Sequence, residues 1–264
     1  MLVANLLDAL FRSFPPETAE PWDHVGLSVG DPMATVTGIT CALDATLENV
    51  RTARSHGSNV LLTHHPVYIK APDAFMPAQS LAPSSSSVVY EAARLGVSII
   101  SMHTNLDRSR EARLLLPVML GLDALSSLEH TEQPELPGLG SVADTPSTSL
   151  SDLAVQAAQT FNSQPRVWGD PATSVHRVAF LGGSLGDLGD LALKAHADAV
   201  ICGEAGYHVC QDLSIRGLGV ILLGHDRSEE PFVEILAKAA QQAGVDPTLI
   251  ATITHSAQWW TAQQ

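Results

Sequence analysis

Cysteine is scarce in this chain. Only three of its 264 residues are cysteines, and no two of them form a CxxC pair; they are Cys41, Cys202 and Cys210. An odd number of widely spaced cysteines argues against a disulfide framework. We therefore expect a protein of a reducing compartment.

Basic residues are also few. The chain has 14 Lys and Arg against 28 Asp and Glu, which gives a formal net charge of −14 at pH 7. Such a surface repels phosphate backbones, so a nucleic-acid partner is not expected. A small anionic substrate stays compatible with this charge if metal ions supply local positive charge.

Long hydrophobic runs are missing. No apolar stretch approaches the roughly 20 residues that cross a bilayer. The opening "MLVANLLDALFRSFPPE" has no cationic region followed by a small-residue cleavage site, and it predicts a short amphipathic helix ended by Pro15 and Pro16. We expect no membrane partner and a cytoplasmic location.

Short β-branched runs alternate with longer Ala- and Leu-rich segments. This alternation predicts an α/β protein with mixed, partly parallel sheets. Gly96 and Gly244 are expected to end helices. The expected strands are 35–43, 59–63, 97–102, 176–181, 198–202 and 219–223, and the expected helices are 46–56, 86–95, 150–161, 187–196 and 230–243.

A polar segment with three prolines, residues 129–149, is the best candidate for a boundary between two lobes. It predicts an N-terminal α/β lobe of residues 1–128 and a C-terminal α/β lobe of residues 129–264. The last helix is expected to pack back on the first lobe.

Histidine and acidic residues follow four of the expected strands. In α/β sheets, ligands bind outside the carboxyl ends of strands. Four such segments from both halves of the chain therefore predict one site. They are His64-His65, "HTNLD" (103–107), "GEAGYH" (203–208) and "GHDRSEE" (224–230).

The two adjacent histidines, His64 and His65, would point to opposite faces of a continued strand. Pro66 cannot donate a ladder hydrogen bond, so the strand is expected to break at the pair. Each imidazole can then bind one ion of a two-metal centre, whose ions lie roughly 3.5–4 Å apart. Further ligands would be Asp107, His225 and Glu229, a mixed N/O set that suits zinc, iron, manganese, cobalt or nickel.

Each of these residues also has a structural interpretation. The histidine pair could be a solvent-exposed loop, and Asp107 could cap the helix that follows it. Glu229 could be a first-turn acid favoured by the helix dipole, with Ser228 as the N-cap. Five further histidines are expected on the surface or in structural roles: His56, His130, His176, His196 and His255.

The run "FLGGSLGDLGD" (180–190) has the glycines of a phosphate loop but lacks a GK[ST] ending. Its spacing does not match a dinucleotide fingerprint either. A turn for close packing of a strand against a helix is the preferred interpretation, with a phosphate-binding loop as the alternative.

Six segments carry a resemblance to a known family. The chain resembles the Nif-three-like family of dinuclear metal-centre proteins, often labelled GTP cyclohydrolase I type 2 homologues, over nearly its whole length. The order and spacing of the segments agree with that family. The segments are "AEPWDHVGLSVGD" (19–31), "LLTHHP" (61–66), "HTNLD" (103–107), "VAFLGGSLGD" (178–187), "ADAVICGEAGYH" (197–208) and "GHDRSEE" (224–230).

The resemblance implies a two-lobed α/β subunit in a toroidal homohexamer. It also implies two divalent metal ions per subunit, between the lobes and at the carboxyl ends of strands. His103 and His208 look like pocket residues. The family's metal ligands fall on His64, His65, Asp107, His225 and Glu229.

Where the family continues "HTNLD" with a glycine pair, this chain has arginines. Arg108 or Arg110 is expected to contact an anionic substrate, or else to lie on a solvated helix face.

The expected function is that of a metal-dependent hydrolase acting on a nucleotide-like or small phosphorylated substrate, with GTP as the family's nominal candidate. His103 is the expected proton-transfer residue. The alternative is a non-catalytic hexameric scaffold or metal-handling protein.

Overall fold

The computed structural model describes residues 1–79, 81–254 and 259–262. The chain forms two compact units: unit 1 contains residues 1–105 and 232–264, and unit 2 contains residues 106–231. The chain thus leaves unit 1 after Asn105 and returns to it at Phe232. Composition predicts a boundary at residues 128 and 129, and that boundary stays a prediction.

Unit 1 is built on a five-stranded sheet with the order β1-β4-β3-β2-β11. Four neighbouring strands run parallel, and β1 pairs antiparallel with β4 at the edge. Three of the parallel strands, β4, β3 and β2, are buried in the centre of the sheet, as expected where helices cover both faces, and β11 lies partly exposed at the edge. The strands are β1 (Gly26–Val29), β2 (Ile39–Ala42), β3 (Val60–Thr63), β4 (Ser98–Ser101) and β11 (Ile250–Ile253).

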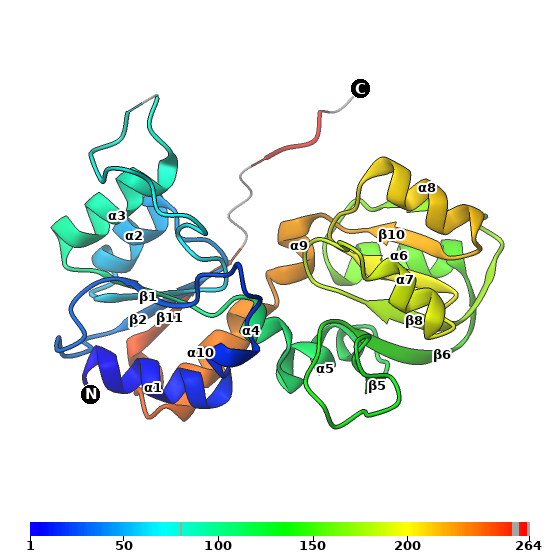
Figure 1. Cartoon of the computed structure of the whole chain (residues 1–264), viewed down its shortest axis with the longest axis horizontal. Coiled ribbons are helices and arrows are strands. Elements are labelled where there is room, and N and C mark those ends of the chain that lie inside the picture. Colours follow the sequence, from blue (N-terminus) through cyan, green and yellow to red (C-terminus); the bar gives the residue numbers. More distant parts are fainter. Residues whose placement is uncertain (80, 255–258, 263–264) are drawn as a thin grey trace. The chain divides into compact units, whose positions relative to one another are not determined.

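Helices cover both faces of this sheet. Two of them, α2 and α3, pack together on one face, and α1 and α10 pack on the other (Figure 1). Val50, Val88 and Ala92 close the core against Leu61 and Ile99 of the sheet. The helices are α1 (Val3–Ser13), α2 (Leu47–Ser55), α3 (Ser84–Leu95) and α10 (Phe232–Gln242).

Local signals set the helix ends. The Thr46 hydroxyl accepts a hydrogen bond from the Asn49 N–H at 3.0 Å and caps α2. Gly96 takes a left-handed conformation (φ +65°) at the end of α3, as expected of a glycine stop. The first helix ends at Ser13, before Pro15 and Pro16, as the sequence predicts.

Unit 2 contains a six-stranded sheet with the order β5-β6-β8-β9-β10-β7. Three central strands, β8, β9 and β10, run parallel, and the outer strands pair antiparallel. The strands are β5 (Ala124–Ser126), β6 (Ser141–Ser149), β7 (Arg166–Trp168), β8 (Ser174–Phe180), β9 (Ala199–Cys202) and β10 (Gly219–Leu222). The helices are α5 (Arg110–Met119), α6 (Leu150–Thr160), α7 (Gly189–Lys194), α8 (Tyr207–Ile215) and α9 (His225–Glu229).

The expected mixed α/β class is confirmed, and all six expected strands are present, five with shorter bounds and one, β8, starting two residues earlier than expected. The segment 129–149, however, contains β6, which pairs with β8. Pro146 lies where this pairing shifts, between Asp144 and Thr148, so the strand accommodates a residue that cannot donate a ladder hydrogen bond.

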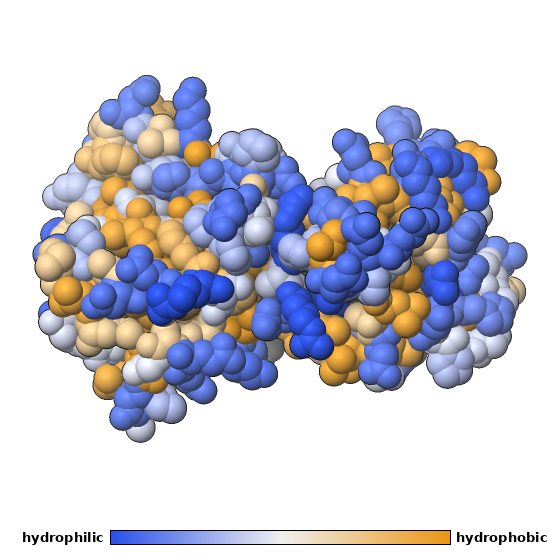
Figure 2. All heavy atoms as spheres, turned by 60° about the horizontal axis from the view of Figure 1, so that its bottom comes forward, coloured by the Kyte–Doolittle hydropathy of each residue, from blue (hydrophilic) through white to orange (hydrophobic). Residues whose placement is uncertain are grey.

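In the view of Figure 2, hydrophilic residues are spread over both units, and hydrophobic residues gather on the face of unit 1 turned to the viewer. Within the described parts of the chain, we find no helix with the length and apolar character that a bilayer crossing requires. The three cysteines are buried and free.

Candidate metal centre

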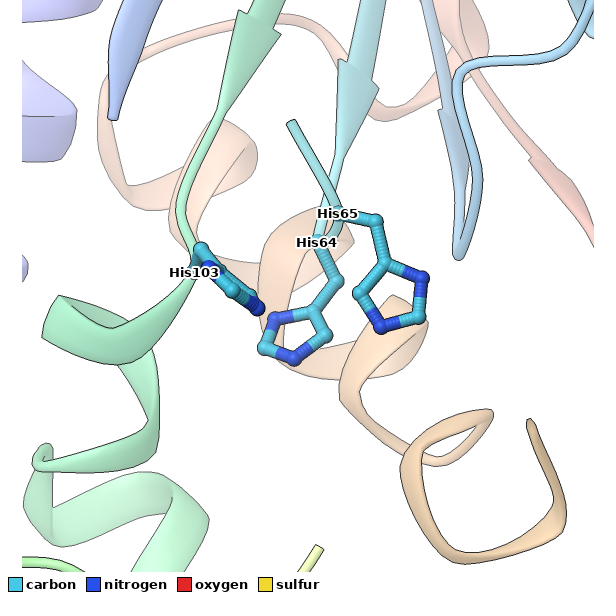
Figure 3. Close-up of side chains that lie close together, drawn as sticks. All are labelled: His64, His65 and His103. Carbon is cyan, nitrogen blue, oxygen red and sulfur yellow. The ribbon is translucent and has the colours of Figure 1, made fainter. Parts of the chain in front are cut away.

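The histidine pair lies just past the end of β3. Thr63 is the last residue of this strand, so the predicted break at the pair is confirmed. The backbone N–H groups of His64 and His65 donate to the carbonyl groups of Ala42 and Leu43, at 3.2 and 2.9 Å. The two rings lie 5.1 Å apart between centroids and turn toward the same region (Figure 3). His64 is fully buried and His65 is partly buried, so the solvent-exposed-loop interpretation is wrong.

A third imidazole, that of His103, joins the pair. His103 follows β4, the parallel neighbour of β3, so the two strands bring their carboxyl ends side by side. Its ring centroid lies 5.3 Å from that of His64 and 5.7 Å from that of His65 (Figure 3). One nitrogen of each of the three rings lies within 4.8 Å of the others. Unit 1 therefore presents three converging imidazoles.

Each of these imidazoles is held through Nδ1. The Nδ1 of His64 lies 2.9 Å from the carbonyl oxygen of Met102. The Nδ1 of His65 lies 2.8 Å from Asp44 Oδ1, and that of His103 lies 2.8 Å from Asp23 Oδ1. Carbonyl and ionised carboxylate oxygens only accept, so Nδ1 carries the proton in each bond. This tautomer makes Nε2 the metal-binding atom, the arrangement usual for metal-binding histidines.

Unit 2 presents a second set of possible metal ligands, in and near α9. His225 and Glu229 are four residues apart on this helix, and His225 Nε2 lies 3.0 Å from Glu229 Oε2. His225 Nδ1 lies 3.1 Å from Glu204 Oε1, so a carboxylate holds this ring as well. A carboxylate oxygen of Asp107 lies within 4.8 Å of one of Glu229. Unit 2 thus offers one imidazole and two carboxylates: His225, Asp107 and Glu229.

The glycine run that follows β8 packs against α9. Gly183 has φ +62°, and its N–H donates to the Ser228 hydroxyl at 2.9 Å. A Cβ on Gly203 would lie only 2.6 Å from Gly183 O and from Ser228 Oγ. Both glycines are therefore required for the close approach of the helix.

The structural interpretations of the two carboxylates are wrong. Ser109 caps α5 by accepting a hydrogen bond from Ala112 N at 3.1 Å, so Asp107 is not the cap. Helix α9 begins at His225, which puts Ser228 and Glu229 in its last turn. An acid at that end is disfavoured by the helix dipole, so the helix does not explain the position of Glu229.

The other histidines divide as follows. His208 lies exposed on α8, outside the candidate ligand groups of the described residues. His56, His176 and His196 are exposed and His130 is partly buried, while His255 lies outside the described residues. The expected surface or structural roles of the four described histidines agree with these positions.

Among the arginines after "HTNLD", Arg108 Nη2 lies 2.9 Å from Glu129 Oε1. Arg113 Nη1 donates to the carbonyl groups of Pro134 and Leu136 at 2.6 and 3.2 Å. Arg110 is exposed. A substrate contact by Arg108 or Arg110 stays a prediction.

The sequence interpretation missed the three carboxylates that hold the rings: Asp23, Asp44 and Glu204. They lie 80, 21 and 21 residues from their histidines along the chain. Only the pairing of distant segments brings them into contact. The signal available was the position of Glu204 two residues after β9, and of Asp44 two residues after β2.

The donor atoms fit a divalent transition metal. Imidazole nitrogens and carboxylate oxygens suit zinc, iron, manganese, cobalt and nickel, and carboxylate or carbonyl partners on the other ring nitrogen raise the basicity of such ligands. The buried His, Asp and Glu groups of this α/β protein could hold a metal ion.

Fold and donor set together define an α/β protein with a candidate metal centre. A family model described as Duf34/NIF3 (NGG1p interacting factor 3) matches residues 1–256, and the chain belongs to this family. A relative from Clostridium acetobutylicum, named "GTP cyclohydrolase 1 type 2 homolog", is 30% identical over 245 residues, covering 91% of this chain and 90% of that protein.

Solved structures share the fold. A hypothetical protein of Staphylococcus aureus superposes with a TM-score of 0.88 at 24% identity, covering 100% of this chain and 99% of the other. A Bacillus cereus protein related to NIF3 gives a TM-score of 0.88 at 19% identity, covering 99% of both chains.

Proposed function

We propose that the protein is a dinuclear-metal-dependent hydrolase acting on a nucleotide-like or small phosphorylated substrate. The observation that carries the proposal is that His64, His65 and His225 are each held at Nδ1 by an oxygen atom. This arrangement directs Nε2 of His64 and His65 to ligand binding, while Nε2 of His225 lies 3.0 Å from Oε2 of Glu229, another proposed ligand. Asp107 and Glu229 complete the proposed ligand set.

The proposed ligand set contains both imidazoles and carboxylates. His64 and His65 of unit 1 supply two imidazoles, and unit 2 supplies the imidazole of His225 and the carboxylates of Asp107 and Glu229. A pair of ions needs anionic as well as neutral ligands to balance its charge. The carboxylates supply that charge, and the imidazoles alone would not.

Divalent ions bound there would act as Lewis acids and would lower the pKa of bound water to about 7. His103 is the proposed proton carrier of the site. Its Nε2 accepts a proton from the attacking water and returns it to the leaving group. The ring is partly buried, with 16% of its side chain exposed to solvent.

The substrate class rests on charge and on the names of relatives. A chain with a net charge of −14 repels anions except where bound cations attract them, which favours phosphorylated compounds at the metal centre. The relative from Clostridium acetobutylicum carries a GTP cyclohydrolase homologue name. GTP is therefore the first substrate to test.

The test is turnover by metal-loaded protein. Purified chain is loaded separately with zinc, manganese, iron, cobalt or nickel and incubated with a panel of nucleotides and small phosphate esters, and products are sought by mass spectrometry. The proposal predicts metal-dependent loss of one substrate class, with no loss in the metal-free protein or in Glu229→Gln. Stoichiometric metal binding without turnover across the panel would instead establish the non-catalytic scaffold or metal-handling role.

A further inference from the structure

Asp23 is a fully buried acidic side chain with a complete set of donors. Its side chain is 0% exposed. Oδ1 accepts hydrogen bonds from the His24 N–H at 2.7 Å and from His103 Nδ1 at 2.8 Å. Oδ2 accepts from the backbone N–H of Thr104 at 3.0 Å and from its hydroxyl group. All four bonds lie within unit 1.

This environment keeps Asp23 ionised. Burial alone would raise the pKa of the carboxyl, but hydrogen bonds from His103 and Thr104, with the charge of His103, lower it from 3.8 to about 2. An ionised carboxylate has no proton to donate. His103 must therefore be the donor in their contact, and its Nδ1 carries the hydrogen.

The anchoring of Asp23 makes this geometry rigid. The Thr104 hydroxyl that donates to Asp23 also accepts from the backbone N–H of Glu20 at 2.8 Å. The backbone N–H of His103 donates to the Asn105 side chain at 2.9 Å. The carboxylate is thus held by several donors, and the backbone of His103 is held beside it, which supports the contact between Nδ1 and Asp23.

From these contacts we propose that Asp23 is a positioning residue that holds His103 as the Nδ1–H tautomer and turns its Nε2 toward His64 and His65. Imidazole in water favours the other tautomer, with the hydrogen on Nε2. Without Asp23, Nε2 would carry that hydrogen and could not accept a proton. Figure 3 shows the His103 ring facing the other two rings.

The role of this tautomer in catalysis rests on the proposed function. The tautomer itself exists without metal or substrate. Asp23 could instead have only a structural role, as the anchor of residues 19–24 on α4 (Thr104–Asp107). In that case the surrounding solvent, and not Asp23, would determine the tautomer of His103. The tautomer is therefore the measurement that separates the two roles.

The experiment uses the full-length chain, labelled with ¹⁵N-histidine and kept metal-free, at about pH 9, well above the ordinary imidazole pKa near 6.5. Long-range ¹H–¹⁵N spectra distinguish the two neutral tautomers, and the His103 signals are assigned by their loss in His103→Gln. We expect the wild type to show Nδ1–H at His103. A wild-type His103 with its hydrogen on Nε2 overturns the proposal, whatever the variants do.

The decisive variant is Asp23→Ala, which removes the acceptor. We expect its His103 to shift to mainly Nε2–H. The matched control is Thr104→Val, which removes the hydroxyl from the same carboxylate but keeps the carboxylate, and we expect it to retain Nδ1–H. An Asp23→Ala protein that folds and keeps the wild-type tautomer contradicts the proposal. If Asp23→Ala fails to fold, the wild-type spectrum decides.

The result of the tautomer measurement does not depend on whether the protein is a hydrolase. A chain with the expected tautomer but no turnover refutes the hydrolase and leaves the positioning role standing. A chain that turns substrate over with His103 in the other tautomer refutes the positioning role alone. Where turnover exists, Asp23→Ala should lower kcat by about tenfold or more relative to Thr104→Val, with a smaller change in KM.

Discussion

Gly183 leaves the space that the carboxylate of Glu229 occupies. A Cβ on Gly183 would lie 2.2 Å from Glu229 Oε1, closer than real Cβ contacts allow. Glu229 is 4% exposed, so its carboxylate has little room to withdraw. A glycine in the loop after β8 therefore sets the position of an acidic side chain on α9, 46 residues later in the chain.

Gly183→Ala should displace this carboxylate and weaken metal binding by about tenfold or more, the usual effect of disturbing the support of a ligand. It should also cost roughly 1–2 kcal/mol of stability, because φ is +62° there. Metal affinity is measured by equilibrium dialysis, and stability by urea unfolding.

Gly186→Ala is the matched control for that variant. Gly186 has φ +50° with no atom within 4 Å of its Cβ position, so alanine there carries the backbone strain alone. We expect a similar loss of stability with unchanged metal affinity. Equal metal affinities in the two variants would show that Gly183 does not act through Glu229.

Glu229→Gln should deplete metal more than Asp226→Asn or Glu230→Gln, because Glu229 is the buried acid that contacts His225. Its neighbours Asp226 and Glu230 are only partly buried. The fold should persist, since the amide keeps the size of the side chain. Elemental analysis of folded protein is the measurement. A larger loss in Glu230→Gln would place the ligand one residue later.

Asp23 should make the stability of the folded chain depend on pH in the acidic range. Its pKa is lowered to about 2 in the folded chain from an ordinary 3.8, so its contribution is complete above the ordinary value and is lost as pH falls toward about 2. The difference of about 1.8 pH units corresponds to roughly 2 kcal/mol. Urea unfolding from pH 5 to 2 should show a steeper decline in the wild type than in Asp23→Asn. Parallel curves would contradict this assignment.

The family resemblance predicts a closed homohexamer, since identical subunits with complementary patches tend to close under point symmetry. Hydrophobic residues grouped on the face of unit 1 in Figure 2 are a feature common at subunit interfaces. Multi-angle light scattering at micromolar concentration should give six times the monomer mass of 27.9 kDa. A stable monomer would contradict the prediction.

The buried strands and amphipathic helices could be predicted because their signals are local. The apolar run before His64 defines β3, and Gly96 ends α3. β6 was not predicted, because only Ser141, Val142 and Ala143 of its nine residues are buried and the rest are five polar residues and a proline. Its identity as a strand depends on pairing with β8, which lies about 30 residues later.

The residues of the candidate site also differ in whether the sequence alone could identify them. His64 and His65 were identified because a histidine pair before a proline is conspicuous in one chain. Asp23 was not, because it precedes β1 by three residues and its role depends on the antiparallel pairing of β1 with β4, which brings it near His103. A buried acid and its imidazole 80 residues apart leave no pattern in a single sequence.

The most direct test of the account is the metal stoichiometry of the purified chain. Metal-free protein is dialysed against zinc or manganese and analysed by elemental mass spectrometry, with His65→Ala and His225→Ala, one variant in each unit, measured beside it. We expect about two ions per wild-type chain and a loss of metal in both variants. A wild-type chain that binds no divalent ion, or variants that bind as much as the wild type, would contradict it.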